Sequence, residues 1–245
     1  MEVGHDEGSA IAASGQAAGF ARRHRNVKVK PAAVDRFGLW FSTSRRIDGL
    51  WVGTMEDKPW PGLRRVEESL RLIKDRAPLH YSRVIHNLER IWVRLLPGDA
   101  AHYERSLKAC VFDERYVLHE TTTIEWIAST IVHEATHARL EQWGVIYEEK
   151  KRARIEAICI RRERNFVGKL PQSEALQEEA ERRLEWCAGD HDHFSDTSFK
   201  QREDEGQIEV LRHLGAPDWV FGFAMKLQAA RLWVHRFVGK VRRQA

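Results

Sequence analysis

Two histidines and a glutamate near the middle of the chain have the types and spacing of a metal site. His133 and His137 are four residues apart, and Glu134 directly follows the first of them in the stretch TIVHEATHARLEQ. On an α-helix, residues four apart lie on one face, so both imidazoles can reach one metal ion. Glu134 is turned by one helical step and can reach a water on that ion. This HExxH pattern therefore predicts a zinc hydrolase centre.

A third protein ligand is needed, because catalytic zinc takes three protein ligands and one water. Glu156 follows His137 after eighteen intervening residues and falls on the next predicted helix, away from its apolar side. We therefore expect Glu156 to complete the ligand set with His133 and His137. The alternatives left open are Glu148, Glu149 and Glu163.

These four positions resemble the gluzincin metallopeptidases, the thermolysin and aminopeptidase type. In that family two motif histidines and a glutamate about this far downstream hold the zinc, as His133, His137 and Glu156 would here. The resemblance covers roughly residues 65–170. It implies an α+β zincin-like domain, mostly helical, with a small sheet beside the active-site helix. It also implies Zn²⁺ as cofactor, Glu134 as general base, and a peptide or protein as substrate.

The chain departs from the family's pattern in one place that bears on the ligands. Thermolysin-like sequences carry an Asp four residues after the ligand glutamate, where it orients a ligand histidine, but Ile160 stands there in this chain. We expect Glu163, one further turn along the same helix, to accept from a histidine instead. The metzincin extension with a glycine and a third histidine is absent, because ARLEQWG follows His137.

Residues outside the motif offer an oxyanion donor and a second candidate metal site. A donor beside developing negative charge would assist hydrolysis. By residue type alone the candidate donors are Tyr147, His119, His191 and His193. The stretch CAGDHDHF, residues 187–194, gathers metal-binding residue types. Its spacing fits no standard zinc finger, so we interpret it as a polar loop.

The motif must lie on a helix, and residues 122–143 carry the signals for one. Apolar residues recur there every three or four positions, on a different side from the histidines. Thr122, with Glu125 three residues later, fits a capping box, and Gly144 fits the position just past the helix end.

The elements around this helix are predicted from shorter signals. RIWVRLLPG, residues 90–98, is dense in branched and aromatic residues and predicts a buried strand. LKACVFDERYVLHE, residues 107–120, predicts another strand, with a hairpin at 113–115 as an option. Gluzincins place the edge strand that lines their cleft at this point. Further helices are predicted over 63–77, 147–166 and 171–187.

Three segments follow from composition and pattern. Residues 1–36 predict a disordered tail, 37–215 the zincin-like catalytic domain, and 216–245 an amphipathic helix. The helix has apolar residues at Val220, Phe223, Leu227, Ala230, Val234 and Phe237. We expect it to pack on the domain. A coiled partner helix or a weak contact with an anionic membrane surface is the alternative.

Charge and cysteine content indicate which partners and which cellular compartment to expect. The formal net charge is +4 over 245 residues, so no specific nucleic-acid partner is expected. The three cysteines form no CxxC pair, which favours a reducing compartment. No secretory signal and no stretch of 18 apolar residues is readable, so we expect a cytoplasmic protein without a transmembrane segment. Oligomeric state and cleavage specificity stay open.

The sequence thus predicts a zinc-dependent hydrolase, most specifically a peptidase, with metal-activated water and Glu134 as general base. One alternative is a metal-binding zincin-like regulator or sensor with little turnover. Another is a helical interaction protein in which the motif is accidental. Metal content separates the interaction protein from the other two, and turnover separates the enzyme from the regulator.

Overall fold

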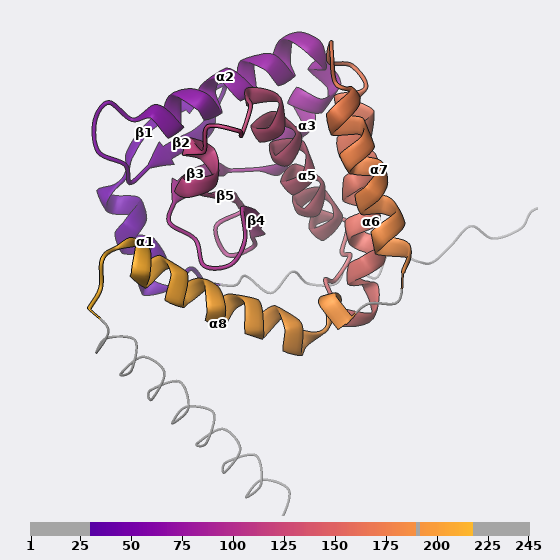
Figure 1. The fold of residues 1–245 in the computed structure, drawn as a ribbon. Coiled ribbons are helices and arrows are strands. Elements are labelled where there is room, and N and C mark those ends of the chain that lie inside the picture. Colours follow the sequence, from indigo (N-terminus) through magenta and orange to yellow (C-terminus); the bar gives the residue numbers. More distant parts are fainter. Residues whose placement is uncertain (1–29, 190–191, 218–245) are drawn as a thin grey trace, which may run out of the picture.

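The fold is a single mixed sheet with helices on both of its faces. In the computed structural model, residues 30–189 and 192–217 are described (Figure 1). The five strands are β1 Thr43–Ile47, β2 Leu50–Thr54, β3 Arg90–Arg94, β4 Ala101–Glu104 and β5 Ala109–Asp113. Their order in the sheet is β1-β2-β3-β5-β4. Strands β2, β3 and β5 are parallel, and β1 and β4 run antiparallel to their neighbours. The expected α+β class is confirmed at this level.

The two central strands are buried because both of their faces meet apolar layers. In β3, Ile91 and Val93 belong to one hydrophobic cluster and Trp92 belongs to another, and all three are fully buried. All residues of β5 are buried. Continuous apolar runs of this kind are typical of parallel strands covered on both sides. The strand predicted within residues 90–98 is therefore confirmed.

The edge strand beside the helices is β4, which the sequence did not predict. Strand β5 lies between β3 and β4, so the expectation that the strand of residues 107–120 forms the edge is wrong. The chain reverses between β4 and β5, where Lys108 adopts a φ of 47°. The hairpin considered at 113–115 is also wrong. Asp113 instead accepts the N–H of Arg115 at 3.0 Å and caps the short helix α4 Glu114–Leu118.

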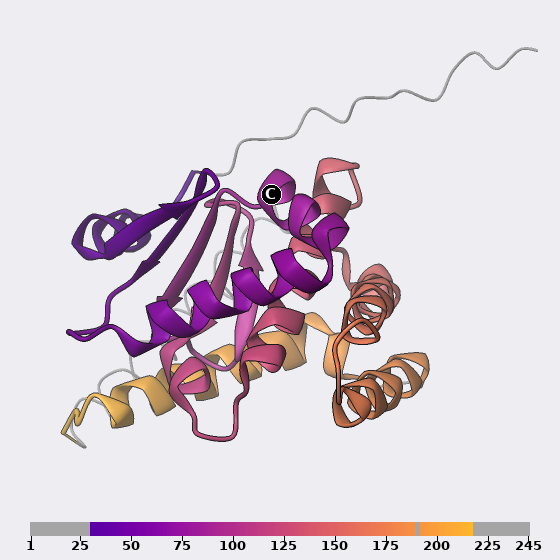
Figure 2. The same cartoon turned by 90° about the horizontal axis from the view of Figure 1, so that it is seen from above.

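Three helices cover one face of the sheet and form the main core with it (Figure 2). They are α2 Pro61–Arg76, α3 Pro78–Asn87 and α5 Ile124–Gln142. The buried apolar residues of α2 recur every three or four positions: Leu63, Val66, Leu70 and Ile73. The sequence pattern placed Val66, Leu70, Leu72 and Ile73 on one side, and of these Leu72 is only partly buried.

Helix α5 carries the motif and is fixed by its own apolar side. Ile127, Ile131 and Ala138 are fully buried in the core. The capping residue is Thr123, which accepts the N–H of Trp126, so the predicted cap at Thr122 is wrong by one position. Gly144 has a φ of 80°, which confirms it as the residue just past the helix end.

Two further helices stack outward from α5. Helix α6 Glu149–Val167 packs along α5, and α7 Glu174–Ala188 packs along α6 (Figure 1). Both were predicted. Helix α8 Asp196–His213 follows a single 3-10 turn, η1, at Asp192–Phe194. The sequence did not predict α8, because no clear apolar pattern follows the polar loop proposed for 187–194.

Helix α8 is attached to the sheet by a close backbone approach. Of its residues, all within the described part of the chain, only Gly206 is buried. A Cβ at that position would lie 1.9 Å from the backbone nitrogen of Gly98, in the turn after β3. Glycine is therefore required for the helix to rest there.

Helix α1 Ala33–Phe41 lies on the other face of the sheet, where Gly38 contacts the ring of Trp92. This helix begins at Ala33, so the last four residues of the segment predicted as a tail, 33–36, lie in α1. Most of the tail and nearly all of the predicted helix over 216–245 lie outside the described residues. Among the described helices, none is long and apolar enough to cross a membrane.

Candidate metal centre

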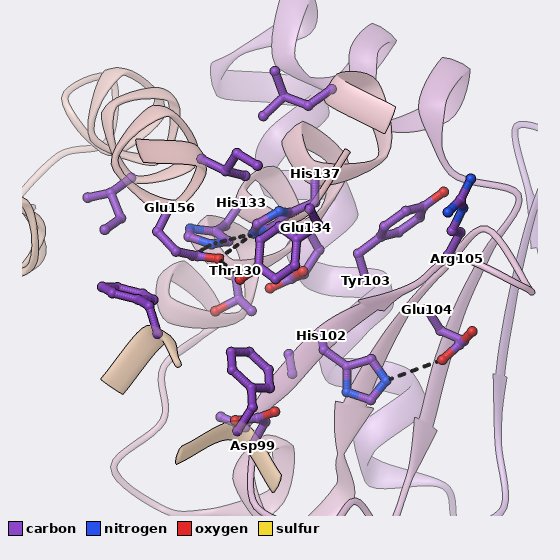
Figure 3. Close-up of a pocket in the computed structure, with 18 of the residues that line it drawn as sticks. Asp99, His102, Tyr103, Glu104, Arg105, Thr130, His133, Glu134, His137 and Glu156 are labelled. Atoms are coloured by element: carbon purple, nitrogen blue, oxygen red, sulfur yellow. Dashed lines mark hydrogen bonds and ion pairs between the residues drawn. The ribbon is translucent and has the colours of Figure 1, made fainter. Parts of the chain in front are cut away.

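A cavity of about 1110 Å³ opens between the motif helix and the edge of the sheet (Figure 3). Helices α5 and α6 line one side, with His133, Glu134, His137 and Glu156, and strand β4 lines the opposite side. Residues of η1 and α8 border it as well. The predicted site residues therefore share one wall of a cavity large enough for a small peptide segment.

The three predicted ligands converge on one point. The Nε2 atoms of His133 and His137 are 3.2 Å apart. The Glu156 carboxylate lies 3.2 Å from His133 Nε2 and 3.4 Å from His137 Nε2. Ligand atoms held about 2.0–2.2 Å from a tetrahedral zinc are about 3.3–3.6 Å apart. All three separations thus come within a few tenths of an ångström of one face of such a tetrahedron.

Cys159 is a second donor that the sequence did not single out. Its sulfur and one nitrogen each of His133 and His137 lie within 4.8 Å of one another, so it also forms a metal-binding cluster with the histidines. Cys159 follows Glu156 by three residues and lies nearly one turn further along α6.

Glu156 and Cys159 differ in how readily each would bind a cation. The Glu156 carboxylate lies 3.2 Å and 3.4 Å from the two imidazole nitrogens. Burial opposes its ionisation, but the hydrogen bonds from both histidines outweigh burial and hold its pKa well below the usual range. Burial, with the nearby carboxylates of Glu156 and Glu134, raises the pKa of the Cys159 thiol well above its usual range. A protonated thiol is a poor ligand until a metal displaces its proton.

A carboxylate behind the site orients His133. Glu163, on α6, lies 3.0 Å from His133 Nδ1 and is itself held by Arg183 of α7 at 3.0 Å and 3.1 Å. With Nδ1 occupied in this way, Nε2 points to the other ligands. Glu163 thus lies where the departure at Ile160 required an acceptor, and metal-binding histidines commonly have such a partner. Arg183 carried no signal in the sequence, because only the packing of α7 on α6 brings it there.

The two carboxylates control the protonation of His133. Burial of the ring opposes protonation, but the hydrogen bonds with Glu156 and Glu163 outweigh burial and raise the pKa of His133 to about 10. The pKa of Glu163 is lowered despite burial, through His133 and Arg183. Without a metal the ring is therefore a cation between two anions, and a divalent cation would substitute for a proton already favoured there.

Glu134 lies beside the ligands without joining them. It is 6% exposed and lines the cavity, and Figure 3 shows its side chain next to His137 and facing the open space. No described residue makes a hydrogen bond with its carboxylate. The group is therefore available to a molecule in the cavity.

Tyr147 lies in the cavity, as one of the donors expected by residue type. Its hydroxyl donates to Glu156, and burial together with that carboxylate raises its pKa, so it stays a donor. Phe199 of α8 packs edge-on against it at 6.4 Å between ring centroids.

The other three expected donors differ in position. His193 also lines the cavity and contacts Arg202. His119 is exposed, lies outside the cavity lining and contacts Thr121. His191 lies outside the described residues, so the second candidate metal site at 187–194 is only partly described. Within the described ranges, the close group of metal-binding side chains is His133, His137 and Cys159, and residues 187–194 contribute none of its members.

No protein-family model, no curated protein and no solved structure matches this chain. The resemblance to gluzincins therefore rests on the motif residues themselves. Any functional argument therefore depends on the arrangement of these residues in the structure.

Proposed function

We propose that this protein is a zinc-dependent hydrolase, most specifically a peptidase of the gluzincin type. The observation that carries the proposal is the trio of separations, 3.2, 3.2 and 3.4 Å, between the nitrogens of His133 and His137 and the carboxylate of Glu156. Three protein ligands leave a fourth position on zinc for water or substrate, which distinguishes catalytic from structural sites.

Zinc bound there would supply a Lewis acid and lower the pKa of a coordinated water to about 7. Glu134 faces the same space and would accept the proton of that water, then deliver it to the leaving amine. Tyr147 would donate its single hydroxyl proton to Glu156 and hold that carboxylate in place. Glu163 and Arg183 would keep His133 in one orientation.

A peptide substrate suits the opposite wall of the cavity. Strand β4 pairs with β5 along one edge, and all four of its residues line the cavity. An extended peptide could follow such an edge, because backbone N–H and C=O groups pair without regard to sequence. This arrangement favours a peptide over a compact small molecule as substrate.

A metal-binding regulator with little turnover is the second candidate, and Cys159 is the observation that favours it. If its thiolate joined His133, His137 and Glu156, the metal would have four protein ligands. A closed set of this kind is typical of structural zinc.

Metal analysis of the purified full chain tests the proposal. After purification with zinc and without chelators, we expect about one zinc per chain. His133→Ala and His137→Ala should lose it, whereas His86→Ala, which changes an exposed histidine, should not. Negligible zinc in the wild type would exclude both the hydrolase and the regulator.

Cys159→Ala separates the two metal-binding candidates. If the chain is a hydrolase, this variant keeps its zinc and its hydrolysis of a mixed peptide library. If Cys159 closes the site, the variant binds zinc more weakly and turnover appears or rises, because a coordination position has opened.

A further inference from the structure

Helix α1 has a second apolar side that the sheet does not use. Val34, Phe37, Trp40 and Phe41 are 70%, 64%, 76% and 65% exposed. Val34, Phe37 and Phe41 follow one another at spacings of three and four, and Trp40 adjoins them, so the four share one side of the helix. The three aromatic rings lie side by side: the ring centroids of Trp40 and Phe41 are 4.7 Å apart, and those of Phe37 and Phe41 are 6.4 Å apart.

The inner side of α1 already holds the helix to the sheet. Gly38 lies against Trp92, whose indole N–H donates to Ser42 at 2.9 Å. Asp35 is buried and pairs with Arg94 at 3.3 Å. The exposed aromatic cluster is therefore presented on a fixed helix and is not needed to attach it.

The exposed charges on α1 and in the sequence just before it are positive. Asp35, the only acid of α1, faces inward. Lys30 and Arg36 are exposed, and within the described part of the chain neither makes an ion pair. Residues 8–34 contain no acid, and the cations there are Arg22, Arg23, Arg25, Lys28 and Lys30. The partner of this side must therefore be apolar where the rings lie and anionic around them.

We propose that α1 and the basic segment before it dock on the surface of an anionic phospholipid bilayer. The helix would lie in the interface with its aromatic cluster among the acyl chain ends and glycerol groups, while the cations meet lipid headgroups. Aromatic rings on one side of a helix, bordered by lysine and arginine, are the composition of interfacial helices.

Charge also argues against the nearest alternative occupant within the chain. Residues 218–245 carry an apolar stripe, but their ionisable residues include one acid, Asp218, against six cations: Lys226, Arg231, Arg236, Lys240, Arg242 and Arg243. Like charge would oppose its packing beside the basic segment. The proposal does not depend on metal binding or hydrolysis.

Vesicle sedimentation with the full-length protein tests the proposal. We expect binding to phosphatidylcholine vesicles with about 30% phosphatidylserine to exceed binding to pure phosphatidylcholine about tenfold, and to weaken in about 0.5 M salt. The variant Phe37→Ser/Trp40→Ser/Phe41→Ser should lose about tenfold in binding, and Trp40→Ser alone should lose a smaller part. Trp143→Ser is the matched control, because Trp143 is 66% exposed at the end of α5.

Circular dichroism and zinc content should match the wild type in all these variants, since no substituted ring is buried. Undiminished vesicle binding by the triple variant would overturn the proposal and assign binding to another segment, residues 218–245 first. Wild-type protein that ignores vesicles also overturns it. In that case, dimerisation lost in the triple variant would identify a second copy as the occupant. Binding to single-stranded RNA that the triple variant loses would identify a nucleic acid.

Discussion

At the residue scale, a substitution of Glu134 can distinguish catalysis from metal binding, because its side chain faces the cavity beside the candidate ligands. Glu134→Gln keeps the size of the side chain and removes the base. We expect zinc content and melting temperature to match the wild type while peptide hydrolysis falls about 100-fold or more. Steady-state rates on a peptide selected from a library would measure the loss. An unchanged rate would remove Glu134 from the mechanism.

Arg183 and Glu163 would act on a bound metal through His133, which Glu163 contacts directly. Arg183→Met should weaken zinc binding about 10-fold, and Glu163→Gln about 10- to 100-fold, because each loosens the orientation of the imidazole. Competition with a fluorescent chelator would measure both affinities. Arg182→Met is the matched control. Arg182 is the neighbouring residue and pairs with Glu179 on the surface instead of with Glu163. Equal effects in Arg182 and Arg183 variants would contradict a role for the Glu163 contact.

The raised pKa of His133, about 10, predicts how the metal-free chain responds to pH. A group whose pKa is raised by folding stabilises the fold fully below its unfolded pKa, about 6.5 for histidine. That contribution is lost as pH rises from there through the folded pKa. Urea unfolding of the metal-free chain should therefore show stability falling between about pH 6.5 and 10. His133→Ala should flatten this decline, whereas exposed His86→Ala should leave it intact.

Three residues of the candidate centre could be predicted from local geometry, and a fourth from a resemblance. His133, Glu134 and His137 share one helix, and helical periodicity fixes their relative directions. The downstream Glu156 came from the resemblance to gluzincins. Cys159 and Arg183 could not be predicted, because their positions depend on how α6 and α7 pack, which no local pattern encodes.

At the scale of elements, helix α8 borders the cavity and has one buried residue, Gly206, through which it rests on the turn after β3. Gly206→Val places a side chain where the backbone of Gly98 lies, and it should dislodge the helix. Valine and glycine are both weak helix formers, so lost propensity would not explain the effect. We expect amide exchange in α8 to quicken about tenfold or more, with the melting temperature nearly unchanged. Gln207→Val, at an exposed position, is the control, and equal exchange in both variants would contradict the docking role.

Strong periodicity explains which elements were predictable. Helices α2, α5 and α6 have long apolar patterns, and β3 and β5 have continuous apolar runs. Helix α7 was predicted as a polar helix, and few of its residues are buried. Strand β4 has four residues, AHYE, all only partly buried, so it carries no pattern of its own and exists because β5 offers it an edge. Helix α8 was missed because its single buried residue is a glycine.

Zinc should stabilise the molecule as a whole, since α5 and α6 both carry candidate ligands. At a free zinc concentration 100 times the dissociation constant, binding adds about 2.7 kcal/mol to the free energy of unfolding. For a domain of this size that raises the melting temperature by about 5–10 °C. Differential scanning fluorimetry with and without a chelator would measure the shift. Ala substitutions at His133 and His137 together should abolish it, and a shift that survives them would place the metal elsewhere.

The most direct test of the central claim is a crystal structure of the zinc-loaded chain with anomalous data at the zinc edge. We predict one anomalous peak about 2.0–2.2 Å from His133 Nε2, His137 Nε2 and a Glu156 oxygen, with a water or an open position completing the tetrahedron. A peak with Cys159 Sγ about 2.3 Å away and no open position would contradict the hydrolase proposal. Crystals without a peak between α5 and α6 would contradict the metal centre itself.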